Sequence, residues 1–293
     1  MKTMGRLRRY RAGKMRMVVT CLILVAIAAF STGTYWVYQE VKTAKKQQST
    51  DEIIRLANIR LVAIEAKKKE PVYISLPGAE KIQVLVENYE DSESIWTLVN
   101  KDRAIPTDYV PPELVVVGVS TRSNSTADEK RVRQTIVGPL TQMFEAASKD
   151  GHSLMVGSAY RSAITQDQLF ETYVARVGYE QANKYSAHPG HSEHQTGLAV
   201  DISTVSQQCY LAECFIGTAD GQWLAENAYK YGFHLRYPKG KEAITGYNFE
   251  PWHYRYVGVN LATALHQSGL THDQAWLYLE TALTTLRSNR AVQ

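Results

Sequence analysis

The stretch at residues 189–201, PGHSEHQTGLAVD, constrains the fold of this 293-residue chain more than any other. The Pro-Gly pair at its start interrupts any preceding helix or strand, and Gly197 lets the backbone turn tightly or approach another group closely. From Leu198 onward apolar residues alternate with other residues, which predicts a short strand. Asp201 then lies on the strand face opposite the apolar side chains, where it meets a cleft or water.

A metal site is the chemistry that this stretch favours. His194 and Asp201 are two of the ligand types that zinc sites in hydrolases combine, with a fourth position left for water. The third ligand is expected in the run EPWH at residues 250–253, because aromatic and polar residues alternate there along another predicted strand. His253 would then enter the same cleft, and Glu250 would lie beside the metal without binding it, as a general base must.

Other histidines lie near this set. His188 and His191 flank the proline of the motif loop, and the spacing from His191 to His194 would let both chelate a metal on a turn. This alternative stays open, although three ligands and a water already complete a catalytic zinc site. His234, in a predicted strand at residues 233–237, is expected to pack in the interior or beside the site. Three further histidines have no motif around them: His152, His266 and His272.

Arg161 follows a predicted buried strand at residues 153–158, and side chains at strand ends often reach into a cleft. A guanidinium can donate two parallel hydrogen bonds to a carboxylate, or stabilise a developing oxyanion. A lone arginine is nevertheless commonly a solvated surface charge. Its position alone therefore assigns it no role.

Three runs occur in order along the chain: SAYRS around Arg161, SEHQTGLAVD, and EPWHYRYVG. Together they resemble the zinc D-alanyl-D-alanine carboxypeptidases of the VanY type and their L,D-carboxypeptidase relatives, over about residues 96–258. The resemblance implies that Zn²⁺ is the cofactor, that the three predicted ligands bind it, and that Glu250 is the catalytic base. It also implies that Arg161 contacts the substrate and the oxyanion that develops on it.

The resemblance further implies removal of the terminal D-alanine from a peptidoglycan stem peptide, with a D,D bond favoured and an L,D bond possible. Gln168, soon after Arg161, and Ser192, in the motif loop, are additional candidates for substrate contacts. One alternative is an endopeptidase that cuts cross-links. Another is a binding module that keeps the zinc fold without catalysis, as in the similar hedgehog signalling domain, although Glu250 stands in the matching place of the base.

The N-terminal region predicts a membrane anchor. Residues 1–16 carry seven Lys and Arg residues and no acid, while residues 17–38 are almost wholly apolar and long enough to span a bilayer at about 20 residues. A cleaved signal peptide is the alternative, but its apolar region would be about 7 to 15 residues. Here the run ends in Tyr35, Trp36 and Tyr38, which fits an interfacial aromatic belt. The expected protein is therefore a single-pass cell-membrane protein, with a cytoplasmic N-terminus and its C-terminal bulk outside the cell.

The net charge of +4 arises from this basic tail, since the remainder has 26 basic against 29 acidic residues. Nothing in that slightly acidic remainder indicates a phosphate-binding surface. Nucleic acid is therefore excluded as an expected partner, and the lipid bilayer and a cell-wall peptide remain.

The predicted fold class is α+β, a small antiparallel sheet with surrounding helices, preceded by one transmembrane helix. Helices are expected from Asp128, from an Asp220 cap, and after a capping box of Thr271 and Gln274. An amphipathic stalk helix, or alternatively a dimerising coiled coil, is expected at residues 51–69, before two short strands around Pro77 and Gly78. The expected divisions are a basic tail at 1–16, an anchor at 17–38, a linker with stalk and lead-in at 39–91, the zinc carboxypeptidase domain at 92–270, and a C-terminal helix at 271–293.

Cys209 and Cys214 follow the Asp201 strand, in a segment expected outside the cell. An oxidising compartment favours a disulfide between them. A free thiol pair and a second metal site are the alternatives. Both are less favoured than the disulfide, because no motif of further ligands lies nearby in the sequence.

Overall fold

The computed structural model of the chain describes residues 72–79, 81–84 and 93–291. The chain divides into two units, Met1–Glu70 and Pro71–Gln293, and every described residue belongs to the second. The predicted basic tail, transmembrane helix and stalk helix lie outside the described residues. Within the part that is described, no helix is both long enough and apolar enough to cross a membrane.

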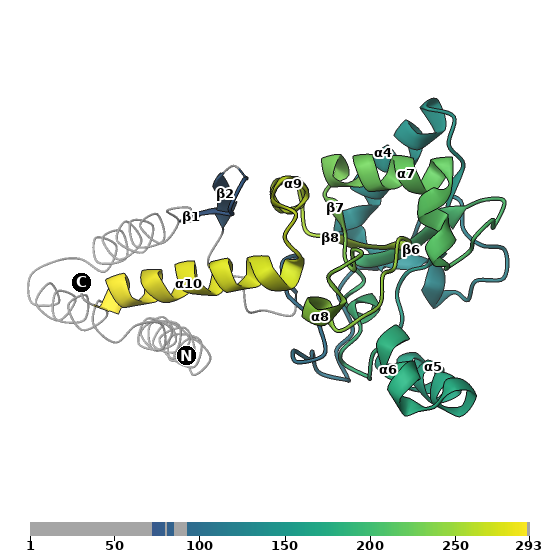
Figure 1. Cartoon of the computed structure of the whole chain (residues 1–293), viewed down its shortest axis with the longest axis horizontal. Coiled ribbons are helices and arrows are strands. Elements are labelled where there is room, and N and C mark those ends of the chain that lie inside the picture. Colours follow the sequence, from purple (N-terminus) through teal and green to yellow (C-terminus); the bar gives the residue numbers. More distant parts are fainter. Residues whose placement is uncertain (1–71, 80, 85–92, 292–293) are drawn as a thin grey trace, which may run out of the picture. The chain divides into compact units, whose positions relative to one another are not determined.

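A four-stranded antiparallel sheet organises the described fold (Figure 1). Its strands, in spatial order, are β5 (Leu154–Ser158), β6 (Ala199–Thr204), β8 (His253–Tyr256) and β7 (Phe233–Leu235). On β6, Val200 and Ile202 enter the main hydrophobic core, while Asp201 lies on the other face and lines a cavity. The sheet therefore has one apolar face and one face that carries polar side chains.

Helices α4 (Gln134–Lys149) and α7 (Ala219–Asn227), with the short turn η5 (Ala228–Tyr231), cover the apolar face of the sheet, on its upper side in Figure 1. The buried residues of α4 recur at three and four, so one stripe of the helix faces the core: Ile136, Leu140, Met143, Phe144 and Ala147. Helices α5 (Ala163–Val177) and α6 (Tyr179–Tyr185) lie below the sheet in the same view. This is the predicted α+β class.

The predicted start of one helix at Asp128 is wrong. The residues before α4 form the 3-10 turn η2 (Asp128–Lys130) and strand β4 (Arg131–Arg133), which pairs antiparallel with β3 (Leu114–Val116). Val132 still enters the core, but it does so from this strand. Backbone pairing with a distant segment therefore overrides the helical spacing of the apolar residues.

The start of α7 also differs from the predicted Asp220 cap. The hydroxyl of Thr218 accepts the hydrogen bond from the N–H of Gly221, at 3.0 Å, and so caps the helix. The carboxylate of Asp220 instead lies 2.8 Å from Nδ1 of His152. Asp220, the predicted cap, therefore contacts a residue that is distant in the sequence, and Thr218 caps the helix instead.

A second hydrophobic cluster involves the C-terminal helices. Strands β1 (Val72–Ser75) and β2 (Lys81–Val84) form the predicted pair of short strands, and α9 (Val259–Ser268) and α10 (His272–Ala291) follow the central sheet. The larger buried residues of this cluster are Leu76, Leu98, Val257, Leu261, Leu265, Trp276, Leu279 and Leu283. Because α10 contributes to the same cluster as α9, its first turns are part of the folded unit that carries the sheet.

The capping box predicted for the last helix is present. The backbone N–H of Thr271 donates to Oε1 of Gln274 at 3.1 Å, and the N–H of Gln274 donates to Oγ1 of Thr271 at 3.2 Å. Two otherwise unpaired N–H groups are thereby satisfied at the helix start. This cap fixes where α10 begins.

Candidate metal centre and active site

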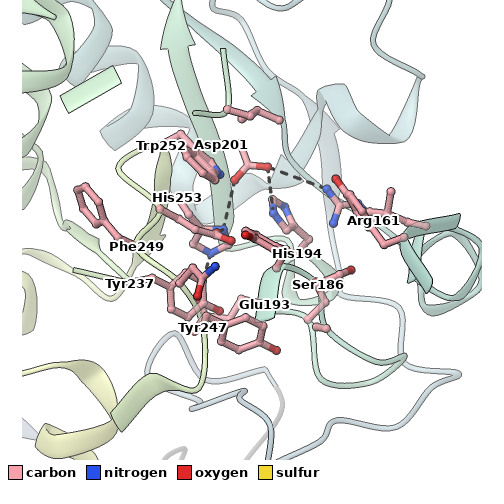
Figure 2. A pocket seen from close by; sticks show the side chains of 18 of the residues that line it. Arg161, Ser186, Glu193, His194, Asp201, Tyr237, Tyr247, Phe249, Trp252 and His253 are labelled. Atoms are coloured by element: carbon pink, nitrogen blue, oxygen red, sulfur yellow. Dashed lines mark hydrogen bonds and ion pairs between the residues drawn. The ribbon is translucent and has the colours of Figure 1, made fainter. Parts of the chain in front are cut away.

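A cavity of about 310 Å³ lies on the polar face of the sheet (Figure 2). Its wall combines ionisable and aromatic side chains. The ionisable ones, phenols aside, are Arg161, Glu193, His194, Asp201, Glu213, Glu250 and His253, and the aromatic ones are Tyr173, Tyr185, Tyr237, Tyr247, Phe249 and Trp252. The structure therefore gathers the three predicted ligands, the predicted base and the predicted substrate-binding arginine in one cavity.

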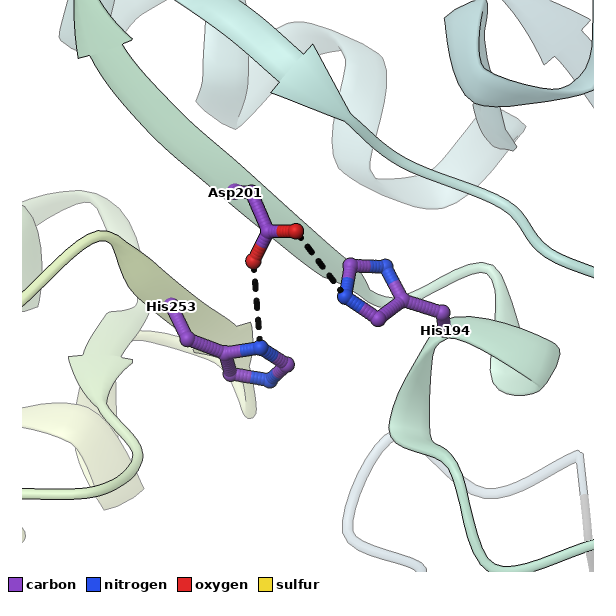
Figure 3. A group of neighbouring side chains, drawn as sticks. All are labelled: His194, Asp201 and His253. Carbon is purple, nitrogen blue, oxygen red and sulfur yellow. Dashed lines mark ion pairs between the residues drawn. The ribbon is translucent and has the colours of Figure 1, made fainter. Parts of the chain in front are cut away.

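His194, Asp201 and His253 all line this cavity, and their side chains point toward one another (Figure 3). Nε2 of His194 lies 3.3 Å from Oδ2 of Asp201, and Nδ1 of His253 lies 3.2 Å from Oδ1 of Asp201. One nitrogen or oxygen from each residue lies within 4.8 Å of the others, and all three side chains are buried. Among the described residues this is the group that could hold a metal ion, and His191 is not in it.

The sheet register places two of these residues directly opposite each other. Asp201 on β6 pairs with His253 on β8, and with Ser158 at the end of β5. His194 lies in the short 3-10 turn η3 (Glu193–Thr196) that leads into β6. The chain can make that approach because Gly197 has a φ of +66°, and a Cβ there would lie 3.0 Å from side-chain atoms of its neighbours.

The segment at residues 100–109, which precedes the central sheet in the chain, holds the loop of the 189–201 motif in place. The amide of Gln195 donates to the carbonyls of Pro106 and Tyr109, at 2.9 and 3.1 Å. The N–H of Ile105 donates to the carbonyl of Gly190, at 2.9 Å. His191, the additional ligand candidate, instead has Nδ1 at 2.8 Å from the carbonyl of Asn100. These contacts support the loop rather than add a ligand.

The residues fit a zinc ion. Oδ1 of Asp201 is buried and accepts no hydrogen bond of good geometry from any described residue, although Nδ1 of His253 is near. A buried carboxylate oxygen without a donor is costly, and a cation between the two histidines would satisfy it. Two imidazole nitrogens and one carboxylate oxygen, beside a cavity large enough for water, form the donor set of a catalytic zinc site.

The electrostatics favour the metal-binding forms of Asp201 and His194, but not that of His253. Burial opposes ionisation of Asp201, but His194 and His253 outweigh it and hold the pKa of Asp201 below its ordinary value. Burial lowers the pKa of His194, against the opposing effect of Asp201. Burial also opposes protonation of His253, but the nearby carboxylates of Asp201 and Glu193 outweigh it and raise the pKa of His253 to about 9. A metal at this site must therefore compete with a proton on His253 but not on His194.

Glu250 lies beside the three ligands without joining them. Its Oε2 is 3.8 Å from Nδ1 of His253, and the residue is buried in the cavity wall. Burial raises the pKa of Glu250 to about 8, and the nearby His253 opposes that rise. A carboxyl group with such a pKa can both accept and release a proton near neutral pH, as a general acid–base catalyst requires.

Arg161 is fixed at the opposite wall. Its guanidinium donates to Oε1 of Gln166 at 2.9 Å and to Oγ of Ser158 at 3.0 Å, and Nη2 lies 4.0 Å from Oδ2 of Asp201 (Figure 2). Its backbone N–H donates to the carbonyl of His194 at 3.3 Å. The cation is thus held within reach of an anionic group placed over the ligands.

The two further predicted substrate contacts differ in position. Ser192 is buried and lines the cavity, whereas Gln168 is exposed on α5 and is absent from the cavity wall. Gln166 is buried instead, and its amide donates to Oγ of Ser186 and to the carbonyl of Ala187, at 3.0 and 2.7 Å. The structure therefore favours Gln166 over Gln168 beside the substrate. The buried positions of α5, Ala163, Gln166 and Phe170, follow a helical spacing that could have indicated this.

The predicted disulfide between Cys209 and Cys214 is present, with Cα atoms 5.5 Å apart. It closes a loop that leads into the turn η4 (Glu213–Gly217), and Leu211, Ala212 and Glu213 in this region line the cavity. The disulfide therefore fixes one wall of the site. The expected oxidising compartment favoured the bond, but the sequence did not show that it lies at the wall of the site.

Sequence reasoning also missed Tyr247 and Glu193. Tyr247 follows the short helix α8 (Glu242–Thr245), and its buried hydroxyl lacks a hydrogen-bond partner among the described residues. Glu193 stands beside His194 in the motif but contacts His253 and two buried arginines. No periodicity in the sequence marks either residue.

The fold and the site together define a metal-dependent hydrolase, and comparison with known proteins gives its family. The VanY family, described as D-alanyl-D-alanine carboxypeptidase, matches residues 129–259. A putative carboxypeptidase of Bacillus subtilis, YodJ, is 43% identical over 189 residues, which are 64% of this chain and 69% of the relative. A D-alanyl-D-alanine carboxypeptidase of Enterococcus faecalis is 33% identical over 214 residues, covering 70% of this chain and 73% of that protein. This chain belongs to the VanY family of carboxypeptidases.

Solved structures agree with this assignment. The LdcB LD-carboxypeptidase is 43% identical and superposes with a TM-score of 0.61, covering 65% of this chain and 88% of that one. The VanY D,D-pentapeptidase from a VanB-type resistance cassette, solved with Zn(II), is 35% identical with a TM-score of 0.51, covering 63% of this chain and 98% of that one. The chain is thus similar in fold to a zinc-containing peptidase, and its own donor set fits the same ion.

Proposed function

We propose that this protein is a zinc-dependent carboxypeptidase that removes the terminal D-alanine from peptidoglycan stem peptides. One observation carries the proposal: His194, Asp201 and His253 converge from separate elements on a buried cavity that also holds Glu250 and Arg161. The names of the VanY-family relatives supply the substrate class.

The three ligands would hold zinc through Nε2 of His194, the carboxylate of Asp201 and Nδ1 of His253. When bound, zinc supplies a water of near-neutral pKa and polarises the carbonyl group that is attacked. Glu250 is placed to accept the proton of the attacking water and to deliver it to the leaving amine of D-alanine. The oxygen of the water adds to the carbonyl carbon, and the C–N bond then breaks as the amine leaves with the proton from Glu250, so one water is consumed for each peptide bond cut.

Arg161 supplies the positive charge that a carboxypeptidase needs for its substrate. Gln166 and Ser158 fix its guanidinium before any substrate enters. A preorganised guanidinium can donate paired hydrogen bonds to the terminal carboxylate, or stabilise negative charge as it develops on the attacked carbonyl oxygen. Both uses require the fixed position that the structure gives this side chain.

The favoured substrate is the D,D bond of a pentapeptide, in line with the family description and the enterococcal relative. The L,D bond of a tetrapeptide is the second candidate, because the LdcB LD-carboxypeptidase shares 43% identity and a TM-score of 0.61. Mass spectrometry of defined penta- and tetrapeptides after incubation with the protein distinguishes the two. Cleavage of cross-linked dimers in the same assay would indicate an endopeptidase.

Glu250→Gln is the direct test of the catalytic role. The substitution keeps the size of the side chain but removes its capacity to accept the proton. Zinc content is expected to stay at the wild-type level, while D-alanine release falls by about 10² to 10⁴-fold. Persistent turnover by this variant would sink the assignment of Glu250 as the base.

We also propose that residues 17–38 anchor the protein in the cell membrane, with residues 1–16 in the cytoplasm and the peptidase outside. The apolar run, the basic tail and the aromatic residues at 35–38 support this proposal. Membrane fractionation followed by protease treatment of intact protoplasts tests it. Recovery of the peptidase in the soluble fraction, or its protection from external protease, would contradict it.

A further inference from the structure

Glu193 is the neighbour of a predicted metal ligand in the sequence, yet its side chain serves a different histidine. Its Oε2 lies 3.3 Å from Nε2 of His253, and Oε1 accepts from Nε of Arg236 at 2.8 Å and from Nη1 of Arg255 at 3.0 Å. The side chains of Glu193 and both arginines have no solvent exposure. Glu193 is therefore a buried acid that joins one metal ligand, His253, to two buried arginines.

The contact with Glu193 fixes which nitrogen of His253 carries a hydrogen. Oε1 of Glu193 accepts hydrogen bonds from the guanidinium groups of Arg236 and Arg255, so two buried cations pair with this carboxylate. An ionised carboxylate only accepts hydrogen bonds, so Nε2 of His253 must be the donor. Nδ1, which lies 3.2 Å from Asp201, is then the nitrogen that can offer its lone pair to a metal.

The arginine that pairs with Glu193 reaches the C-terminal helix. Arg236 donates from Nη1 to Oδ2 of Asp273 at 2.6 Å and from Nη2 to Oδ1 at 3.3 Å, which makes the pair bidentate. Asp273 lies in the first turn of α10, whose start the capping box fixes, and its Oδ1 also accepts from Nδ2 of Asn100 at 2.8 Å. The second arginine, Arg255, donates to the carbonyls of Thr97 and Ile95, at 2.8 and 3.2 Å.

We propose that Glu193 is a positioning residue for the metal ligand His253, and that Asp273 on the C-terminal helix extends this positioning through Arg236. Asp273 lies beyond residues 129–259, the part of the chain that the VanY family matches. The C-terminal helix thereby becomes part of the metal site's support. The proposal rests on the metal site of the proposed function, but it does not depend on the substrate.

Zinc affinity of the full-length protein tests the role of Glu193. Glu193→Gln keeps the size of the side chain, but its amide group replaces one acceptor oxygen with a donor. The variant is expected to bind zinc about 10 to 100-fold more weakly in competition with a chromogenic chelator. Imidazole ¹⁵N spectra of the zinc-loaded wild type should show His253 protonated at Nε2, and this signature should be lost or altered in the variant.

Asp273→Asn tests the longer connection without touching the ligand or its carboxylate. We expect zinc binding to weaken by about tenfold or less, because the effect passes through Arg236. Glu280→Gln is the matched control on the same helix, since Glu280 pairs with Arg103 at the surface. Asp220→Asn is a second control, because it breaks a histidine–carboxylate contact away from the cavity. Both controls should keep wild-type zinc affinity.

The outcomes decide the proposal either way. A folded Glu193→Gln protein with zinc affinity within about twofold of wild type and an unchanged His253 spectrum overturns it. If Glu193→Gln does not fold, the Asp273→Asn measurement decides, and an affinity equal to that of Glu280→Gln overturns the proposal. Partial recovery in Glu193→Asp would support positioning by the carboxylate. A protein that binds zinc as expected but releases no D-alanine would count against the proposed function alone.

Discussion

His194 and His253 lie on either side of Asp201, and the protein holds them by different means. Nδ1 of His194 donates to a neutral acceptor, the carbonyl of Ala159 at 2.6 Å, at the end of the neighbouring strand. His253 instead contacts an ionised carboxylate, Glu193, that two buried arginines hold. The contacts that hold His194, here called the His194 side, consist of a strand end and a turn. The contacts that hold His253, the His253 side, form a network of charged side chains from distant parts of the chain.

The difference shows that a metal site can combine local and long-range support. The neutral acceptor costs little to bury and leaves the basicity of His194 low. The anionic acceptor makes His253 a stronger base and a stronger ligand, but its charge must be balanced by buried cations. Four experiments break or sharpen this comparison: three substitutions in order of expected effect, and then a pH titration.

Asp201→Asn acts on both sides at once, because Asp201 lies between the two histidines. The amide is a weaker ligand than the carboxylate, so we expect D-alanine release to fall on the order of a thousandfold or more. Zinc per chain, measured after dialysis, should fall as well. Asp220→Asn, which removes a carboxylate outside the cavity, should retain both. Wild-type activity in Asp201→Asn would refute the site.

Arg236→Met breaks the His253 side alone. It leaves the buried carboxylate of Glu193 with fewer partners and removes the only hydrogen bonds between Arg236 and Asp273. Loss of about 3–5 kcal/mol in the free energy of unfolding is expected, measured by denaturant titration with tryptophan fluorescence. Arg161→Met, beside His194, loses two hydrogen bonds and should cost about 1–2 kcal/mol. Equal losses in the two variants would mean that the contrast between the sides is wrong.

Gly197→Ala breaks the His194 side. Its positive φ and the close side-chain atoms of Leu114 and Arg133, at 3.0 Å, should together cost about 1–3 kcal/mol of stability. Gly269 has a similar φ of +64° with no atom within 4 Å of an added Cβ. Gly269→Ala is therefore the control for the backbone cost alone. Zinc affinity should fall only in Gly197→Ala, and an equal fall in both would contradict the placement of His194 by this turn.

The pH dependence of the free energy of unfolding tests the burial of His272, the residue before Asp273 in the chain. Burial, with Arg236 and Arg255 nearby, lowers the pKa of His272 to about 3, so this residue is neutral in the folded protein between about pH 3 and 6.5. The unfolded chain takes up a proton on His272 in this window, so stability falls as the pH falls, by about 1.4 kcal/mol per pH unit. His272→Gln should flatten this slope in denaturant titrations from pH 7 to pH 4. An unchanged slope would contradict the burial of a neutral His272.

The sequence allowed prediction of the parts of the site that depend on local patterns. Asp201 and His253 could be placed because alternation along a strand fixes the face of each side chain, and metal-binding residue types are recognisable by their chemistry. The described fold then paired them across two strands, Asp201 opposite His253. The small antiparallel sheet, the two N-terminal strands and the last helix cap follow from the same local rules.

The charged support of His253 could not be predicted in this way. Glu193, Arg236 and Asp273 look like ordinary surface charges in the sequence, because nothing local shows that all three become buried together. Only the tertiary structure brings them into contact. The predicted helix start at Asp128 was wrong for a related reason, because Arg131–Arg133 pairs with a strand that precedes it in the chain. The glutamine beside Arg161 was placed two positions too late because the phase of a helix depends on what packs against it.

The position of Asp273 has a consequence for the order of events during synthesis. A chain made from its N-terminus exposes residue 250 and residue 253 before it reaches Asp273, the second acid that pairs with Arg236. Until that acid arrives, the cation beneath His253 has one partner fewer, and the histidine lacks its full support. The support of His253 is therefore complete only after residue 273 has been synthesised, later than the metal ligands themselves.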